Sequence, residues 1–320
     1  TVHVYYSYLA TLLGFHEDGE RISSEFLENC QFPGMESQRS ICIHNLGLIA
    51  ERIGDYKKSL RLMKQAIRLG KEHPNTVFPT YYLWLGYVQF LLGDYQQGMT
   101  TLQHSYHLFS EKNTLWGKGF ALSKMSLAAN GLGQYKLAIQ YSQEALSLFQ
   151  DIDDPFGISY AYSRLSVSEY FLEKYEQAVE YGEISNQLFR KLNHRWGISA
   201  SLCRMGFGFL GLGELENAGF CFHEALEVSW GAQETPLCLY ALAGKASWMM
   251  LTGSQEPAIA LFQYIRHHPQ TPSLYIQKAE IWFQEVDTSA AKIEAMELKK
   301  DGKRATLEEV VQAFLQGKGH

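Results

Sequence analysis

Two pairs of side chains in this sequence have the types and spacing for metal binding or redox chemistry. His104 and His107 are three residues apart, which would place both imidazole rings on one face of a helix. No third ligand accompanies them, so we interpret them as solvated or packing histidines. Cys203 and Cys221 lie in adjacent predicted helices of one repeat, but small apolar thiols are among the most buried side chains, and we favour core packing over a redox pair.

Two further clusters of polar residues are explained by chain geometry. His267 and His268 precede Pro269 at the end of an apolar segment, where an imidazolium suits the helix dipole, and we interpret them as helix-capping residues. Asp153 and Asp154 stand beside a proline and are typical of a turn rather than of a general acid and base. Neither cluster predicts a catalytic site.

The sequence lacks the motifs of the common enzyme classes. No Ser-His-Asp or Cys-His set can be assembled from its spacing, and no GxxxxGK[ST] phosphate loop occurs, because Gly244-Lys245 is followed by alanine and lacks the upstream glycine. We therefore predict no catalytic residues, no metal site and no cofactor, and an unrecognised hydrolase activity is the least favoured alternative.

Charge and cysteine usage restrict the partners and the compartment. The net charge of −6 argues against binding of nucleic acid or an anionic membrane by this region. The five cysteines, at positions 30, 42, 203, 221 and 238, form no CxxC pair and are typical of buried thiols in a reducing cytoplasm. No long apolar run and no signal peptide occur, so we expect a cytoplasmic protein with no membrane contact.

A repeat of about forty residues organises most of the chain. Its marker is a turn position that recurs in steps of 40, 39, 40, 40, 40 and 40 residues, at Gly14, Gly54, Gly93, Gly133, Glu173, Gly213 and Gly253. Small residues flank this turn on both sides, and larger apolar residues surround them at helical spacing. Two small columns around one turn predict a tightly packed helical hairpin, which must stack on its neighbours to bury its apolar face.

The two ends of the chain depart from the repeat. The first unit is degenerate between Glu20 and Pro33, and the forty-residue register is lost after Ile265, where His267-His268-Pro269 ends the predicted helix. Near the end, Thr306 fits the N-cap of a last helix through Leu315, with Glu309 three residues on. We therefore predict two domains, a repeat array over 1–265 and a helical cap over 266–320.

The turn and small-residue columns resemble the tetratricopeptide repeat, over roughly residues 1–265. The resemblance implies an all-α, right-handed superhelix of about seven helical hairpins, with the first helix of each hairpin on the concave side. Units of forty residues, with a glycine column at 117, 157 and 197, also resemble the C-terminal sensor regions of bacterial signal-transducing ATPases with numerous domains (STAND), such as the maltotriose-responsive and antibiotic-regulatory activators.

This resemblance implies a non-catalytic sensor that binds an inducer or partner on its concave surface and holds a nucleotide-binding domain of a longer protein inactive. The concave positions carried over from the family are His44, Glu51, Arg52, Tyr87, Phe90, Asn130, Ser163, Tyr170, Phe207 and Tyr240. They form an aromatic wall that is poor in positive charge and suits a sugar, a hydrophobic peptide or a partner helix better than a phosphorylated ligand. Burial of these side chains between repeats is the alternative at each position.

Several hypotheses follow for the function of the chain. The first is the sensor of a STAND-type transcriptional regulator, whose partners are a protein, a peptide or a small-molecule inducer together with the nucleotide-binding domain. The second is a stand-alone scaffold that binds a peptide or protein. A variant of the first replaces gene regulation with antiviral defence.

Overall fold

The computed structural model describes residues 16–29, 32, 34–72, 78–283, 299–300 and 303–317. The helices of the repeats are α2 (His16–Asn29), α3 (Glu36–Arg52), α4 (Tyr56–Lys71), α5 (Pro79–Leu91), α6 (Tyr95–Glu111), α7 (Leu115–Gly131), α8 (Tyr135–Asp151), α9 (Pro155–Phe171), α10 (Tyr175–Lys191), α11 (Arg195–Leu212), α12 (Leu215–Gly231), α13 (Thr235–Leu251) and α14 (Gln255–Arg266). The predicted all-α repeat fold is confirmed. The predicted first turn at Gly14 lies outside the described residues.

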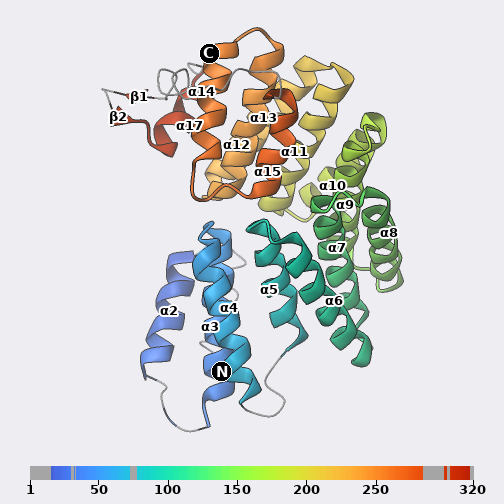
Figure 1. Ribbon diagram of the computed structural model, residues 1–320, viewed down its shortest axis with the longest axis vertical. Coiled ribbons are helices and arrows are strands. Elements are labelled where there is room, and N and C mark those ends of the chain that lie inside the picture. Colours follow the sequence, from blue (N-terminus) through green and yellow to red (C-terminus); the bar gives the residue numbers. More distant parts are fainter. Residues whose placement is uncertain are drawn as a thin grey trace. The chain divides into compact units, whose positions relative to one another are not determined.

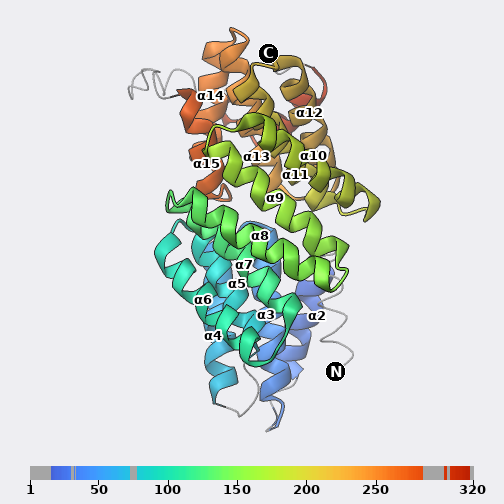
Figure 2. The same cartoon turned by 90° about the vertical axis from the view of Figure 1, so that its right-hand side faces the viewer.

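Consecutive helices pair into hairpins, as predicted (Figure 1, Figure 2). We call α3, α5, α7, α9, α11 and α13 helices A, and α4, α6, α8, α10, α12 and α14 helices B. The turn from A to B uses the left-handed backbone conformation, with φ of +83° at Gly54 and +74° at Gly213. Glu173 occupies the same position with φ of +60°, a conformation that costs a residue with a side chain about 1–2 kcal/mol.

The small-residue columns lie where the backbones of neighbouring helices approach each other. Within a hairpin, the Ser59 hydroxyl donates to the Gly47 carbonyl over 2.7 Å. A second series joins residues 26 positions apart, in which Ser105 donates to the Pro79 carbonyl over 2.9 Å. Equivalent bonds run from Ser40 to Ala66, from Ser185 to Ser159 and from Ser199 to Ala225. A small hydroxyl therefore allows close packing and also satisfies a carbonyl that is buried by it.

The glycine column that begins the longer helices A also has a steric cause. A Cβ atom built on Gly117 would lie 2.1 Å from the ring of Phe109, and one on Gly197 would lie 2.3 Å from the ring of Phe189. Both phenylalanines are buried in the last turn of a helix B. Each ring therefore packs directly on the backbone of the next helix A, and only glycine leaves the necessary space.

The chain forms two compact units, residues 1–157 and 158–320. The second unit ends in a cap, which contains α15 (Ser273–Glu280), the 3-10 helix η1 (Ile281–Phe283), the antiparallel pair β1 (Lys299–Lys300) and β2 (Lys303–Arg304), and α17 (Leu307–Leu315). The predicted capping box is present, since Thr306 and Glu309 exchange both hydrogen bonds. The division into an array over 1–265 and a cap over 266–320 stays a prediction.

None of the helices in the described residues is long and apolar enough to cross a membrane.

Candidate ligand-binding surfaces on helices A

The histidine pair of α6 is separated into two unrelated contacts. The His104 ring packs edge-on against Tyr82 with 4.5 Å between centroids. His107 Nε2 instead lies 3.3 Å from a carboxylate oxygen of Glu111 on the exposed face. Within the described residues, no group of three or more His, Cys, Asp or Glu side chains could hold a metal ion. His104 and His107 therefore make separate packing and ionic contacts on the surface of α6.

The predicted turn and cap residues have the contacts that their interpretation requires. Asp153 has a left-handed φ of +49°, and Asp154 accepts a hydrogen bond from the Phe156 amide at 3.1 Å. At the end of α14, His267 Nδ1 lies 2.9 Å from the Gln263 carbonyl. Gly244-Lys245 lies inside α13, where a helical backbone cannot form a phosphate loop.

The described cysteines occupy buried positions and form no disulfide with one another; they are Cys42, Cys203, Cys221 and Cys238. Burial raises the pKa of Cys221 to about 12 and that of Cys238 to about 11, and it raises the pKa of Cys203 as well. A thiol reacts as its thiolate, so these groups are poor nucleophiles at neutral pH. The arrangement favours the packing role over a redox pair.

The predicted concave residues lie on helices A, and nearly all of them are buried. Tyr87 retains 7% of its exposure, whereas Phe207 and Tyr240 retain 0% and 1%. His44, Glu51, Phe90, Asn130, Ser163 and Tyr170 are also buried, and Arg52 is partly buried. Their assignment to ligand binding stays a prediction, and burial between repeats is the competing role at each position.

In the first unit, aromatic rings surround polar groups of α3 and α7. His44 stacks on Tyr81 with 4.5 Å between centroids, and burial lowers its pKa to about 3, so the ring is neutral. The Lys124 ammonium lies 3.6 Å from the ring centroid of Tyr87. Burial raises the pKa of Glu51, and the nearby Arg52 and Lys124 oppose that shift. Charged and neutral hydrogen-bonding groups therefore lie together on these helices A.

In the second unit, the predicted aromatic residues form one continuous stack. Tyr240 stacks on Phe207 at 5.6 Å and on Tyr275 of α15 at 4.0 Å between centroids. Tyr170 packs edge-on against Phe207 at 6.0 Å. Lys278, also from α15, places its ammonium 4.9 Å from the centroid of Tyr170. The cap thus contributes to the same cluster as the helices A.

The expectation that these faces are poor in positive charge is wrong. Lys124, Arg164 and Arg204 recur at forty-residue spacing on α7, α9 and α11, and all three are buried. Sequence reasoning missed them because only the positions carried over from the family were considered for the concave surface. The signal that could have found them is the exact repeat spacing, since a solvated charge has no reason to follow the packing period.

Several buried polar atoms on helices A have no hydrogen-bond partner among the described residues. They include His44 Nε2, Gln89 Oε1 and Ser123 Oγ in the first unit, and Ser163 Oγ with Arg204 Nε and Nη1 in the second. Four of the six helices B, namely α4, α8, α10 and α12, carry no such atom in the part of the chain that the structure describes. Buried polar groups are nearly always paired, so their accumulation on helices A calls for an explanation.

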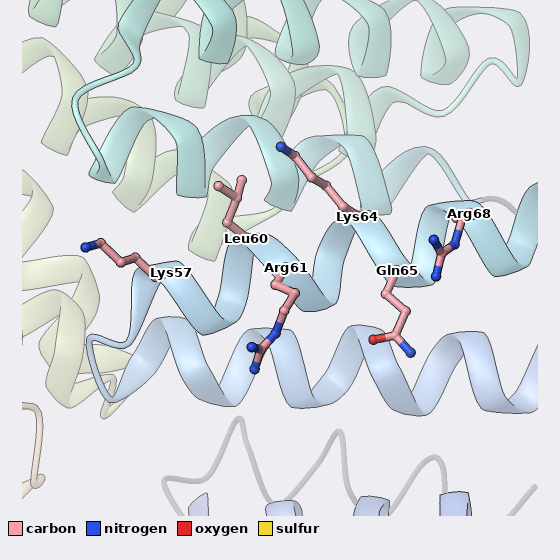
Figure 3. A pocket seen from close by; sticks show the side chains of 6 residues that line it. All are labelled: Lys57, Leu60, Arg61, Lys64, Gln65 and Arg68. Carbon is pink, nitrogen blue, oxygen red and sulfur yellow. The ribbon is translucent and has the colours of Figure 1, made fainter.

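A second surface feature lies on the outer helix α4. Lys57, Leu60, Arg61, Lys64, Gln65 and Arg68 line an open pocket of about 650 Å³ (Figure 3). Leu60 and Lys64 extend to one side of the helix, and Arg61 and Gln65 extend to the other (Figure 3). The sequence of α4 contains no acidic residue. The basic side chains are exposed, and exposure to solvent is sufficient to account for the stripe.

Comparison with known proteins agrees with this architecture. A family model described as tetratricopeptide repeat matches residues 42–73, which span most of α3 and all of α4. A comparison with curated protein sequences finds no significant match.

Solved structures with the same fold cover most of the chain at low identity. NprR in complex with its cognate peptide NprX matches with a TM-score of 0.62 and 15% identity, over 92% of this chain and 77% of that one. A Rap protein complexed with competence and sporulation factor matches with a TM-score of 0.60 and 10% identity, over 92% of this chain and 98% of the Rap chain. A STAND protein with a tetratricopeptide repeat sensor from Pyrococcus horikoshii matches with a TM-score of 0.55 and 14% identity. The match covers 92% of this chain and 44% of the Pyrococcus horikoshii chain. The predicted resemblance to tetratricopeptide-repeat proteins, a STAND sensor among them, is therefore confirmed.

Proposed function

We propose that this chain is a non-catalytic, tetratricopeptide-like repeat region that binds a peptide or protein partner through its helices A. The observation that carries the proposal is the set of buried polar atoms on α3, α5, α7, α9 and α11 that lack a partner within the described residues. A buried donor or acceptor without a partner costs about 1–3 kcal/mol. A ligand rich in amide groups would supply the missing hydrogen bonds, while the aromatic side chains beside them would contact its apolar groups.

Two of the similar structures support a peptide as the ligand. NprR and the Rap protein were each solved with a bound peptide or factor, and both share this repeat fold over 92% of the present chain. We further propose that the chain is the sensor of a STAND-type ATPase that regulates transcription, which the fold of the Pyrococcus horikoshii protein supports. A peptide receptor that acts without such an ATPase is the second candidate, since the match extends over 98% of the Rap chain.

Selection from a peptide library tests the binding proposal. The purified chain is mixed with random hexapeptides and separated by gel filtration, and the retained peptides are identified by mass spectrometry. A retained peptide should raise the free energy of unfolding by about 2.7 kcal/mol at a hundred times its Kd. Replacement of Gln89 by leucine should weaken binding if this unpaired amide contacts the peptide in the first unit. Replacement of the exposed Gln65 on α4 by leucine is the matched control and should leave binding unchanged. A chain that retains no peptide would refute the proposal.

The STAND part is tested separately on the gene. An open reading frame upstream of the Thr1 codon that encodes a phosphate loop and a DNA-binding domain is the expected result. A frame that encodes neither would leave the independent peptide receptor as the better account.

A further inference from the structure

Three cationic side chains from three different helices are buried together in the second unit. Arg164 of α9, Arg204 of α11 and Lys278 of α15 retain 2%, 5% and 1% of their exposure. Both arginines lower the pKa of Lys278 further than burial alone does, so each guanidinium lies within electrostatic reach of the Lys278 amine. The cap helix therefore brings a third cation to a pair that the repeat itself provides.

The described part of the chain provides no counter-charge for two of these groups. No ion pair within it includes Arg204 or Lys278. Arg204 Nε and Nη1 also have no acceptor there. A guanidinium keeps its charge in proteins and offers five donors, so a buried one is normally paired with an anion. The cluster has the composition of an anion site.

The surroundings of the cluster indicate what kind of anion fits. The Lys278 ammonium lies 4.9, 5.9 and 5.8 Å from the ring centroids of Tyr170, Phe207 and Tyr240. Ring faces attract an ammonium or a guanidinium, and a guanidinium stacked on a ring still directs its in-plane N–H groups towards an acceptor beside the ring. Aromatic walls favour an anion that is carried on an apolar group. A carboxylate matches the planar fork of arginine and can accept two parallel hydrogen bonds from it.

We propose that Arg164, Arg204 and Lys278 bind a carboxylate of the ligand in the second unit, with Tyr170, Phe207 and Tyr240 contacting the apolar group that carries it. This inference rests on the proposed function, because it names the chemistry by which the ligand is recognised. The carboxylate is the C-terminus of a peptide, an acidic side chain or part of a small organic acid. The long side chains of the three cations can change rotamer to admit it, as interface side chains commonly do on binding.

A matched pair of small probes tests the carboxylate directly. N-acetyl-phenylalanine carries an apolar ring and a carboxylate, whereas N-acetyl-phenylalanine amide differs only in the missing charge. Isothermal calorimetry on the whole chain should detect the acid and show that the amide binds at least about 30-fold more weakly, which corresponds to about 2 kcal/mol. Equal binding of the acid and the amide would overturn the proposal.

Three variants assign the binding to the cluster. Arg204→Gln and Lys278→Met should each weaken the binding of N-acetyl-phenylalanine by at least about 30-fold. Arg61→Gln, on the exposed stripe of α4, should leave it unchanged and controls for general attraction of anions. Both cluster variants should unfold at or above the temperature of the unaltered chain, because each removes a buried basic group whose charged form is destabilised by burial. Unchanged binding in both cluster variants would refute the site.

The source of the carboxylate is separated by peptide libraries. Loss of retention on C-terminal amidation would identify the peptide terminus, and loss on omission of aspartate and glutamate would identify a side chain. Binding of the small acid with no retained peptide would support the carboxylate site and refute the peptide function. Retention of peptides irrespective of any carboxylate would refute the site and support the function. If neither the acid nor any peptide binds, both proposals are wrong.

Discussion

Replacement of Lys278 by methionine should stabilise the protein, and the gain should grow as the pH falls. Lys278 retains 1% of its exposure, and burial together with Arg204 and Arg164 lowers its pKa well below 10.5. Lys278 therefore binds a proton more readily in the unfolded chain than in the folded chain. Stability should rise with pH between the folded pKa and 10.5, and it should be lost as the pH falls through that range. Methionine has a similar volume and no charge, so this dependence should disappear.

The magnitude of the effect follows from the linkage of one proton. The unaltered chain should lose up to about 1.4 kcal/mol per pH unit relative to Lys278→Met while Lys278 remains unprotonated in the folded state. Between about pH 8.5 and about pH 6.5 the difference should therefore grow by up to about 2.7 kcal/mol. The buried Tyr170, Tyr240 and Cys203 have raised pKa values and stay protonated in this interval, so they do not contribute.

Urea unfolding of both chains, followed by tryptophan fluorescence and circular dichroism across this pH interval, measures the difference. Lys245→Met is the matched control, because Lys245 is also buried and its pKa is also lowered, but Glu227 opposes that shift. Its pH dependence should therefore be weaker. Parallel stability curves for the unaltered chain and Lys278→Met, or a Lys278→Met chain that is less stable at every pH, would refute the reasoning.

Three further predictions concern single positions of the repeat. The unaltered chain should lose about 1.4 kcal/mol of stability per pH unit as the pH falls from 6.5 towards about 3, since the buried His44 ring resists protonation. His44→Gln should abolish this pH dependence, and acid titration of both chains measures the difference. Gly197→Ala should destabilise by about 1–3 kcal/mol because its Cβ would meet the Phe189 ring, whereas Gly231→Ala, with open space around it, should not, and thermal unfolding compares them. Glu173→Gly should stabilise by about 1 kcal/mol by relieving a left-handed φ, and no rise in the unfolding temperature would contradict this explanation.

The fold could be predicted from the sequence because its determinants are local and recur. Glycine at the turn, a small residue on each side of it and helical spacing of apolar residues all act within one hairpin, so each repeat confirms the assignment of the others. The serine bonds over 26 positions were not foreseen, although the small column that contains Ser105 and Ser185 was. The sequence pattern predicts the size of these residues. The carbonyl that accepts each hydrogen bond is determined only by how neighbouring helices pack.

The candidate site was predicted less well because it depends on contacts between elements far apart in the sequence. The aromatic residues Tyr170, Phe207 and Tyr240 were placed on helices A correctly, but their mutual stacking required the three-dimensional arrangement. Lys278 lies beyond the last repeat, where no register connects it to Arg204. Only the fold of the cap brings its ammonium over the same rings.

Small residues and buried cations both recur at forty-residue spacing, but they have opposite effects on the stability of the fold. That difference distinguishes a packing role from a binding role. Small residues such as Gly197 recur because any larger side chain would clash with a neighbouring ring, so the ligand-free fold itself requires them. Arg204 follows Arg164 at the same interval, yet the described part of the chain provides no counter-charge for Arg204, and burial of such a cation destabilises the ligand-free fold. A repeat that served packing alone would gain stability from an apolar residue at this position. The presence of Arg204 is explained if the unfavourable burial is offset when an anion binds.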